Sequence, residues 1–147
     1  KKQFVVISPN NDPGSEKIFS ILEFLDANYF KIIPTMRFKY FSELIKNTSI
    51  FIGNSSTGIR EIPFLGIFSI DIGTRQFNRS PEQNILNYSP FDRNLLVETI
   101  NKYWGVKTKK SEHFGVGKSR ENFVKVLKSS EYWKIPLQKV FFDSNIY

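Results

Sequence analysis

The sequence predicts an α/β protein of the Rossmann-like class, with a parallel sheet between helices in a three-layer α/β/α arrangement. Short β-rich runs alternate with stretches of helical periodicity, which is typical of βαβ units. The run Phe4–Ile7 is almost continuously apolar, as expected for a strand buried on both faces. The chain has 147 residues and is 40% hydrophobic, which suits one globular domain with a sizeable core.

The first strand is predicted at Gln3–Ser8, and Pro9–Gly14 has the composition of a turn. Ser15 is the expected N-cap of the following helix. Apolar residues in that helix recur at the spacing of one helical face, at Ile18, Ile21, Leu22 and Leu25.

The same alternation continues through the middle of the chain. A strand at Phe30–Ile33 and a loop at Pro34–Arg37 precede a helix at Phe38–Lys46, expected to bury Phe41, Leu44 and Ile45. A third strand at Ser49–Ile52 enters a tight turn at Gly53–Thr57, and a helix then runs to about Leu65. The next elements are strands at Ile67–Ile72 and Asn84–Tyr88, separated by a loop at Gly73–Pro81, and a helix at Asp92–Trp104.

The last part of the chain predicts a loop, a helix and an apolar tail. The loop is expected at Gly105–Lys118, and the helix at Ser119–Leu127 with Ser119 as its N-cap. The tail is too apolar for a free end, and its large side chains are Tyr132, Trp133, Ile135, Leu137, Val140, Phe141 and Phe142. We therefore expect it to pack on this domain or on another one.

Composition excludes several classes of site. The chain has no cysteine, which excludes disulfides, thiolate metal sites and cysteine nucleophiles. Its one histidine, His113, is expected on a surface loop, and we predict no metal site and no cofactor. No apolar run approaches the ~18 residues that span a bilayer, and the N-terminus does not resemble a signal peptide, so we expect a cytoplasmic protein without a membrane partner. The net charge of +7 is scattered except at Lys107–Lys110, and we expect no nucleic-acid partner.

The most informative stretch is the strand, turn and helix over residues 50–61. The strand leads into small, mostly hydroxyl-bearing residues, namely Ser55, Ser56, Thr57 and Gly58. The first amides of a helix lack intrahelical acceptors and lie at the positive end of its dipole, so this turn can bind a phosphate. Glu61, one turn further on, is placed to accept hydrogen bonds from the two hydroxyls of a ribose.

Two interpretations fit these residues equally well: a nucleoside diphosphate site, or a serine cap followed by a solvated Glu61. Arg75 favours the first, because it follows the fourth strand and so emerges at the same carboxyl edge of the sheet. The alternative for Arg75 is a surface salt bridge. Asn10 and Asp12, in the first βα turn, lie at this edge either as ligand-binding groups or as ordinary turn residues.

The run Gly53-Asn54-Ser55-Ser56-Thr57-Gly58-Ile59-Arg60-Glu61, followed by Gly73-Thr74-Arg75-Gln76 and Arg79, resembles the C-terminal half of hydrolysing UDP-N-acetylglucosamine 2-epimerases. The likeness is greatest to the branch that serves sialic acid and other nonulosonic acid biosynthesis. It extends in the expected order over nearly the whole chain, through residues 9–15, 36–41, 114–119 and 133–139.

The resemblance implies a glycosyltransferase-B-type architecture in which substrate binds between two Rossmann-like halves. Residues 1–129 would form the nucleotide-binding domain, and residues 130–147 a helical tail that packs back toward an N-terminal domain outside this chain. The implied contacts with UDP or UDP-N-acetylglucosamine are the diphosphate with Ser55, Ser56, Thr57 and Arg75, the ribose with Glu61, and the uracil with the backbone of Met36, Arg37 and Phe38. Asn10 and Asp12 would lie near the substrate.

In that family UDP leaves by elimination, and water then adds to give N-acetylmannosamine. The catalytic carboxylates come from the N-terminal half, so we expect no catalytic residue in this chain and no activity from the chain alone. Asp12 is the one acidic residue here with any prospect of a proton-transfer role. We expect a homo-oligomer for the full-length protein. Two alternatives stay open: half of a glycosyltransferase-B-type transferase, and a stand-alone UDP-sugar-binding protein.

Overall fold

The computed structural model describes residues 2–138, in which strands and helices alternate. The strands are β1 (Phe4–Ile7), β2 (Phe30–Ile33), β3 (Phe51–Gly53), β4 (Ser69–Ile72) and β5 (Ile85–Tyr88). The helices are α1 (Ser15–Leu22), α2 (Phe38–Lys46), α3 (Thr57–Phe64), α4 (Arg93–Tyr103) and α5 (Ser119–Lys128), followed by the short 3₁₀ helix η1 (Tyr132–Lys134). Each strand and helix predicted between residues 3 and 127 is present, with bounds that differ by no more than a few residues.

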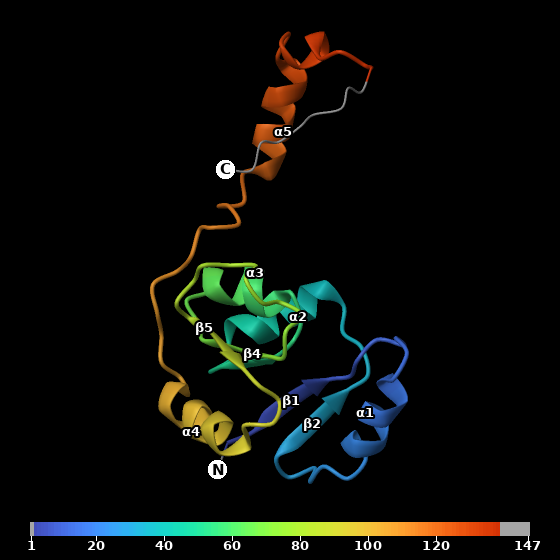
Figure 1. Cartoon of the computed structure of the whole chain (residues 1–147), viewed down its shortest axis with the longest axis vertical. Helices are drawn as coiled ribbons and strands as arrows, with labels where there is room; N and C mark the ends of the chain where they lie inside the picture. Colours follow the sequence, from blue (N-terminus) through green and yellow to red (C-terminus); the bar gives the residue numbers. More distant parts are fainter. Residues whose placement is uncertain (1, 139–147) are drawn as a thin grey trace.

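Every strand pair is parallel, which confirms the predicted α/β class. Within residues 2–138 the strands form two sheets, one of β1 and β2 and one in the order β3-β4-β5. Phe4 lies opposite Phe30 in the first sheet, and Gly53 lies opposite Asp71 in the second. Helices α2 and α3 lie over the three-stranded sheet, and α1 lies beside β2 (Figure 1).

The core forms where α2 and α3 meet the start of β4. Ile45, Ile62 and Ile67 are at most 5% exposed and form one cluster. Partly buried side chains surround them, namely Phe41, Phe51 and Leu65. Of the residues that α2 was predicted to bury, Ile45 is fully buried, while Phe41 and Leu44 are half-buried.

One local prediction, that β1 is buried on both faces, is wrong. Val5 is 45% exposed and Ile7 is 36% exposed, while Phe4 and Val6 are half-buried. The Phe4 ring stacks on Phe30, with centroids 5.2 Å apart, and its centroid lies 5.5 Å from the ring of Trp104 at the end of α4. Aromatic side chains therefore cover one face of β1, and the other face stays open.

The two predicted serine caps are also wrong. Ser15 and Ser119 are themselves the first residues of α1 and α5, and neither helix has a side-chain cap hydrogen bond. Gly14 adopts the left-handed conformation before α1, with φ 92°. The Ser15 amide donates to the Asp12 carbonyl at 3.0 Å. A backbone turn thus starts α1 in place of a side-chain cap.

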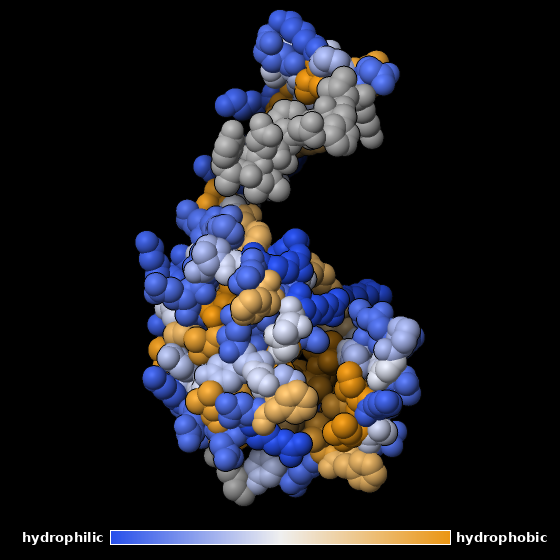
Figure 2. All heavy atoms as spheres, viewed as in Figure 1, coloured by the Kyte–Doolittle hydropathy of each residue, from blue (hydrophilic) through white to orange (hydrophobic). Residues whose placement is uncertain are grey.

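Helix α5 stands apart from the α/β body (Figure 1). It packs on η1, where the Trp133 Nε1 donates to the Leu127 carbonyl at 2.8 Å. Of the predicted tail over residues 130–147, residues 139–147 lie outside the described part. Figure 2 shows hydrophobic atoms on the face around β2 and α1. Between residues 2 and 138 no helix has both the length and the apolar character that crossing a membrane requires.

Candidate functional site

The turn between β3 and α3, residues 54–57, is called the serine turn below. The Gly58 amide donates to the Ser55 carbonyl at 3.0 Å, and the Arg60 amide donates to the Ser56 carbonyl at 3.0 Å. Within residues 2–138 the amides of Ser55 and Ser56 have no hydrogen-bond partner, and neither does the Ser56 hydroxyl. Both serines are exposed, so the start of α3 is open with respect to residues 2–138.

Serine capping is weak at this helix. Ser56 occupies the N-cap position without a side-chain cap hydrogen bond. The Ser55 Oγ accepts from the Thr57 amide at 3.3 Å, a long contact. The alternative of an ordinary serine cap therefore accounts for one long hydrogen bond of Ser55. It does not account for the other donors of the turn, the amides of Ser55 and Ser56 and the Ser56 hydroxyl, which have no partner within residues 2–138.

Glu61 lies on α3 one turn beyond Thr57 and is half-buried. Its Oε2 atom is buried and has no hydrogen-bond partner within the described residues. The alternative from the sequence, a fully solvated Glu61, does not hold for this buried oxygen. A buried acceptor without a donor is unfavourable, and a hydroxyl donor from a ligand would satisfy it.

The loop after β4 is joined to the serine turn by a side chain that the sequence interpretation missed. Gln76 is 3% exposed, and its Nε2 donates to the Asn54 carbonyl at 2.9 Å. Its Oε1 accepts from Arg79 Nη1 at 2.7 Å. Asn54 is 22 positions from Gln76, and Arg79 comes close to Gln76 only through a turn, so residue spacing does not predict either hydrogen bond. The one sequence signal for Gln76 is that a polar residue follows a strand.

Arg75 is exposed in the same loop, next to Gln76. The ion pairs of the described residues are Lys46 with Glu43 and Lys134 with Glu131. A surface salt bridge for Arg75 is therefore absent from residues 2–138, and its guanidinium is available to a ligand.

Asp71 lies on β4 opposite Gly53, the residue from which the serine turn leaves β3. It is 2% exposed, and its Oδ2 has no hydrogen-bond partner among the described residues. Burial raises the pKa of the Asp71 carboxyl above its ordinary value, because the charged form loses its hydration. Asp71 is a residue that the sequence interpretation missed; the signal that could have indicated it is an acidic residue between Ile70 and Ile72 in a predicted strand.

The remaining predicted residues follow the two-stranded sheet. Asn10 and Asp12 are exposed in the turn after β1. Met36 is half-buried before α2, while Arg37 and Phe38 are exposed at its start. No hydrogen bond of the described residues joins these groups to the serine turn. Their substrate and uracil roles stay predictions.

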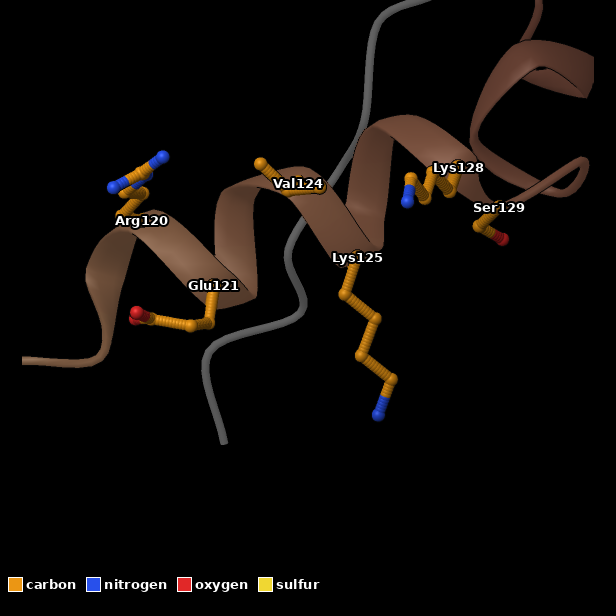
Figure 3. A pocket seen from close by; sticks show the side chains of 6 residues that line it. All are labelled: Arg120, Glu121, Val124, Lys125, Lys128 and Ser129. Atoms are coloured by element: carbon orange, nitrogen blue, oxygen red, sulfur yellow. The ribbon is translucent and has the colours of Figure 1, made fainter.

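A shallow hollow elsewhere on the chain lies along α5. Its lining residues are Arg120, Glu121, Val124, Lys125, Lys128 and Ser129. All of them belong to α5 or to the residue after it, and none is a predicted site residue (Figure 3). The residues of the serine turn are not among those that line this hollow.

Comparison with known proteins shows the family. The model of the UDP-N-acetylglucosamine 2-epimerase family matches residues 1–128. The chain is 35% identical to the UDP-N-acetylglucosamine 2-epimerase of Neisseria meningitidis serogroup B, over 99% of this chain and 39% of that protein. It is 30% identical to the UDP-N,N'-diacetylbacillosamine 2-epimerase (hydrolyzing) of Legionella pneumophila, over 86% of this chain and 34% of that protein.

A third relative is the polysialic acid biosynthesis protein P7 of Escherichia coli, which is 29% identical over 95% of this chain and 37% of that protein. The chain thus spans between 34% and 39% of the length of these relatives. Because the family model covers most of the chain and agrees with its parallel α/β fold, this chain belongs to the UDP-N-acetylglucosamine 2-epimerase family.

Proposed function

We propose that this chain is the UDP-binding half of a hydrolysing UDP-N-acetylglucosamine 2-epimerase, an enzyme that releases N-acetylmannosamine and UDP by elimination followed by hydration. The observation that carries the proposal is the open start of α3. Among residues 2–138, its amides and the Ser56 hydroxyl have no partner and lie one turn from a buried carboxylate oxygen that also has none. The name of the Legionella relative supports the hydrolysing subtype, and that of the Escherichia coli relative supports a place in sialic acid biosynthesis.

Each part of the proposed site has a distinct task. The amides of Ser55 and Ser56 and the Ser56 hydroxyl donate to diphosphate oxygens, and the dipole of α3 favours the negative charge. Arg75, which has no ion-pair partner in the described chain, adds a guanidinium suited to phosphate. Glu61 accepts hydrogen bonds from the ribose hydroxyls.

This division of tasks explains how the chain contributes to catalysis without supplying an acid or base. Charge develops on the diphosphate as its bond to the sugar breaks, and donors already fixed at the serine turn stabilise that charge. Proton removal from the sugar requires a positioned base, which we assign to the part of the longer protein that this chain lacks. The 147-residue chain should therefore bind UDP and release no N-acetylmannosamine. Product formation by the pure chain would contradict this assignment.

The ribose contact gives the sharpest test of the proposed site. Replacing Glu61 with Ala removes a charged acceptor, so UDP affinity should fall by about 10- to 100-fold, because hydrogen bonds to charged groups contribute roughly 1.5–3 kcal/mol. Calorimetry should show that the unmodified chain prefers UDP to 2′-deoxy-UDP, and that Glu61→Ala binds both with equal affinity.

A matched control is Glu121→Ala, which removes an exposed glutamate from the first turn of α5. It should leave both affinities unchanged. If Glu61→Ala still preferred UDP to the deoxy nucleotide, the ribose assignment would be wrong.

A further inference from the structure

Gln76 connects two loops that leave neighbouring strands. Its Nε2 donates to the Asn54 carbonyl at 2.9 Å, directly before Ser55, and its Oε1 accepts from Arg79 Nη1 at 2.7 Å. The Gln76 side chain is 3% exposed, whereas its partners Asn54 and Arg79 are exposed, so the Gln76 end of each bond is the buried end. Breaking either bond would leave a buried polar atom unpaired, which makes the connection costly to disrupt.

A tight turn brings Arg79 back to Gln76. The Arg79 amide donates to the Gln76 carbonyl at 3.3 Å, and the Phe77 amide donates to the Thr74 carbonyl at 3.1 Å. Asn78 completes the turn with φ 58°, a conformation that asparagine tolerates better than most residues. The guanidinium of Arg79 is thus fixed by the backbone and by Gln76 together.

The side chains of Arg75 and Arg79 differ in whether other residues of the described chain hold them in place. Arg75 makes no described hydrogen bond or ion pair, so binding a ligand would immobilise a flexible side chain at a cost in entropy. Arg79 uses Nη1 to reach Gln76 and keeps further N–H donors for another group. Its orientation is set before a ligand arrives.

We infer that Gln76 is a positioning residue that fixes the serine turn relative to Arg79, and that Arg79 is a second phosphate-binding guanidinium of the site. The inference rests on the proposed function, because it assigns both residues to the same diphosphate. Gln76 holds the carbonyl side of Asn54, so the amides of Ser55 and Ser56 keep their orientation toward the ligand. Arg79 then supplies the positive charge that the serine turn lacks.

The experiment compares UDP with uridine, because uridine lacks the diphosphate. Calorimetric titrations would use the chain and four variants, Arg79→Ala, Gln76→Ala, Gln76→Glu and Asn84→Ala. Asn84 is a matched control, since it is a buried amide, 5% exposed, that donates to the Ile67 carbonyl at 3.0 Å. It precedes β5 and so lies at the amino edge of the strands, away from the serine turn.

Arg79→Ala should lower the affinity for UDP by about 10- to 100-fold and leave uridine binding unchanged, as expected for one lost charged contact. Gln76→Ala should lower the UDP affinity in the same way. Gln76→Glu keeps an acceptor for Arg79 but cannot donate to Asn54, so it should lose part of the UDP affinity. Asn84→Ala should lower the melting temperature and leave the preference for UDP over uridine intact.

The outcomes separate the two proposals. If the unmodified chain binds UDP no better than uridine, the proposed function and this inference both fail. If the unmodified chain prefers UDP and Arg79→Ala keeps that preference, only the role assigned to Arg79 is wrong. Because Arg79 is exposed, this variant tests binding without removing a buried side chain. If Asn84→Ala reduces the preference as much as Gln76→Ala does, the effect of Gln76 is structural and its positioning role is overturned.

Discussion

At the scale of single residues, Asp71 shows how a buried acid connects the site to stability. It lies on β4 opposite Gly53, and it has a buried oxygen without a partner among the described residues. Desolvation raises the pKa of its carboxyl. The folded state therefore favours the neutral acid more than the unfolded chain does, and ionisation of Asp71 lowers the free energy of unfolding.

Asp71→Asn should remove that cost. Because the folded-state pKa is raised, the stability from the neutral acid is fully present below the ordinary value of 3.8 and is lost as pH rises through the folded-state pKa. The variant should thus gain in melting temperature relative to the unmodified chain as pH rises above the ordinary value of 3.8. Thermal unfolding followed by circular dichroism at several pH values measures this gain. A difference that does not change with pH would contradict the assignment.

Residue type and spacing were enough to select Ser55, Ser56 and Glu61 from the sequence, because the chemistry of an open helix start depends on local order. The same reasoning passed over Gln76. Its bond to Asn54 joins residues separated by 22 positions, and only the folded loops bring those residues together. Arg75 was selected by its place after a strand, whereas the arginine that the structure orders is Arg79.

At the scale of elements, the position of α3 depends on its close packing against β4. A Cβ atom added to Gly58 would lie 2.5 Å from the Ser69 Oγ and 3.0 Å from the Phe51 ring. Ser69 is fully buried. Glycine therefore allows the first turn of α3, and with it the serine turn, to approach the sheet.

Gly58→Ala should destabilise the chain by about 1–3 kcal/mol, the usual cost of overpacking a close contact. Ser69→Ala removes the nearest atom, so Gly58→Ala should cost less in that background, a coupling that a double-mutant cycle in urea measures. Equal costs in both backgrounds would show that the contact with Ser69 does not limit the approach of α3.

The alternation of strands and helices was predictable because hydrophobic periodicity reports which side of an element faces a core. Helix α2 has the predicted bounds, Phe38–Lys46. How α1 and α5 begin was not predictable from residue type alone: Ser15 and Ser119 are the first helical residues and cap neither helix, and Gly14 in a left-handed conformation starts α1 through the backbone. The open face of β1 was missed because an apolar run does not say whether anything covers both of its faces.

At the scale of the whole molecule, α5 and η1 stand apart from the α/β body (Figure 1), and both carry large apolar side chains that are exposed. Phe123 is 64% exposed and Trp133 is 69% exposed. Exposed apolar surface of this kind favours association. We propose that another part of the longer protein covers these apolar side chains. The chain by itself should self-associate through α5 and η1.

Removing residues 119–147 should reduce self-association without unfolding the body, because α5 packs on η1. Light scattering at increasing protein concentration should show a lower average mass for the shortened chain, while its melting temperature stays close to that of the full chain. A large fall in melting temperature would show that this region stabilises the body.

The central claim is that the open start of α3 binds the diphosphate of UDP. The most direct measurement is an NMR titration of the isotope-labelled chain with UDP, followed through its backbone amide resonances. The account predicts that the amides of Ser55, Ser56 and Thr57 shift progressively with UDP and remain in place with uridine. Unchanged serine-turn amides at saturating UDP, with shifts elsewhere such as along α5, would contradict it.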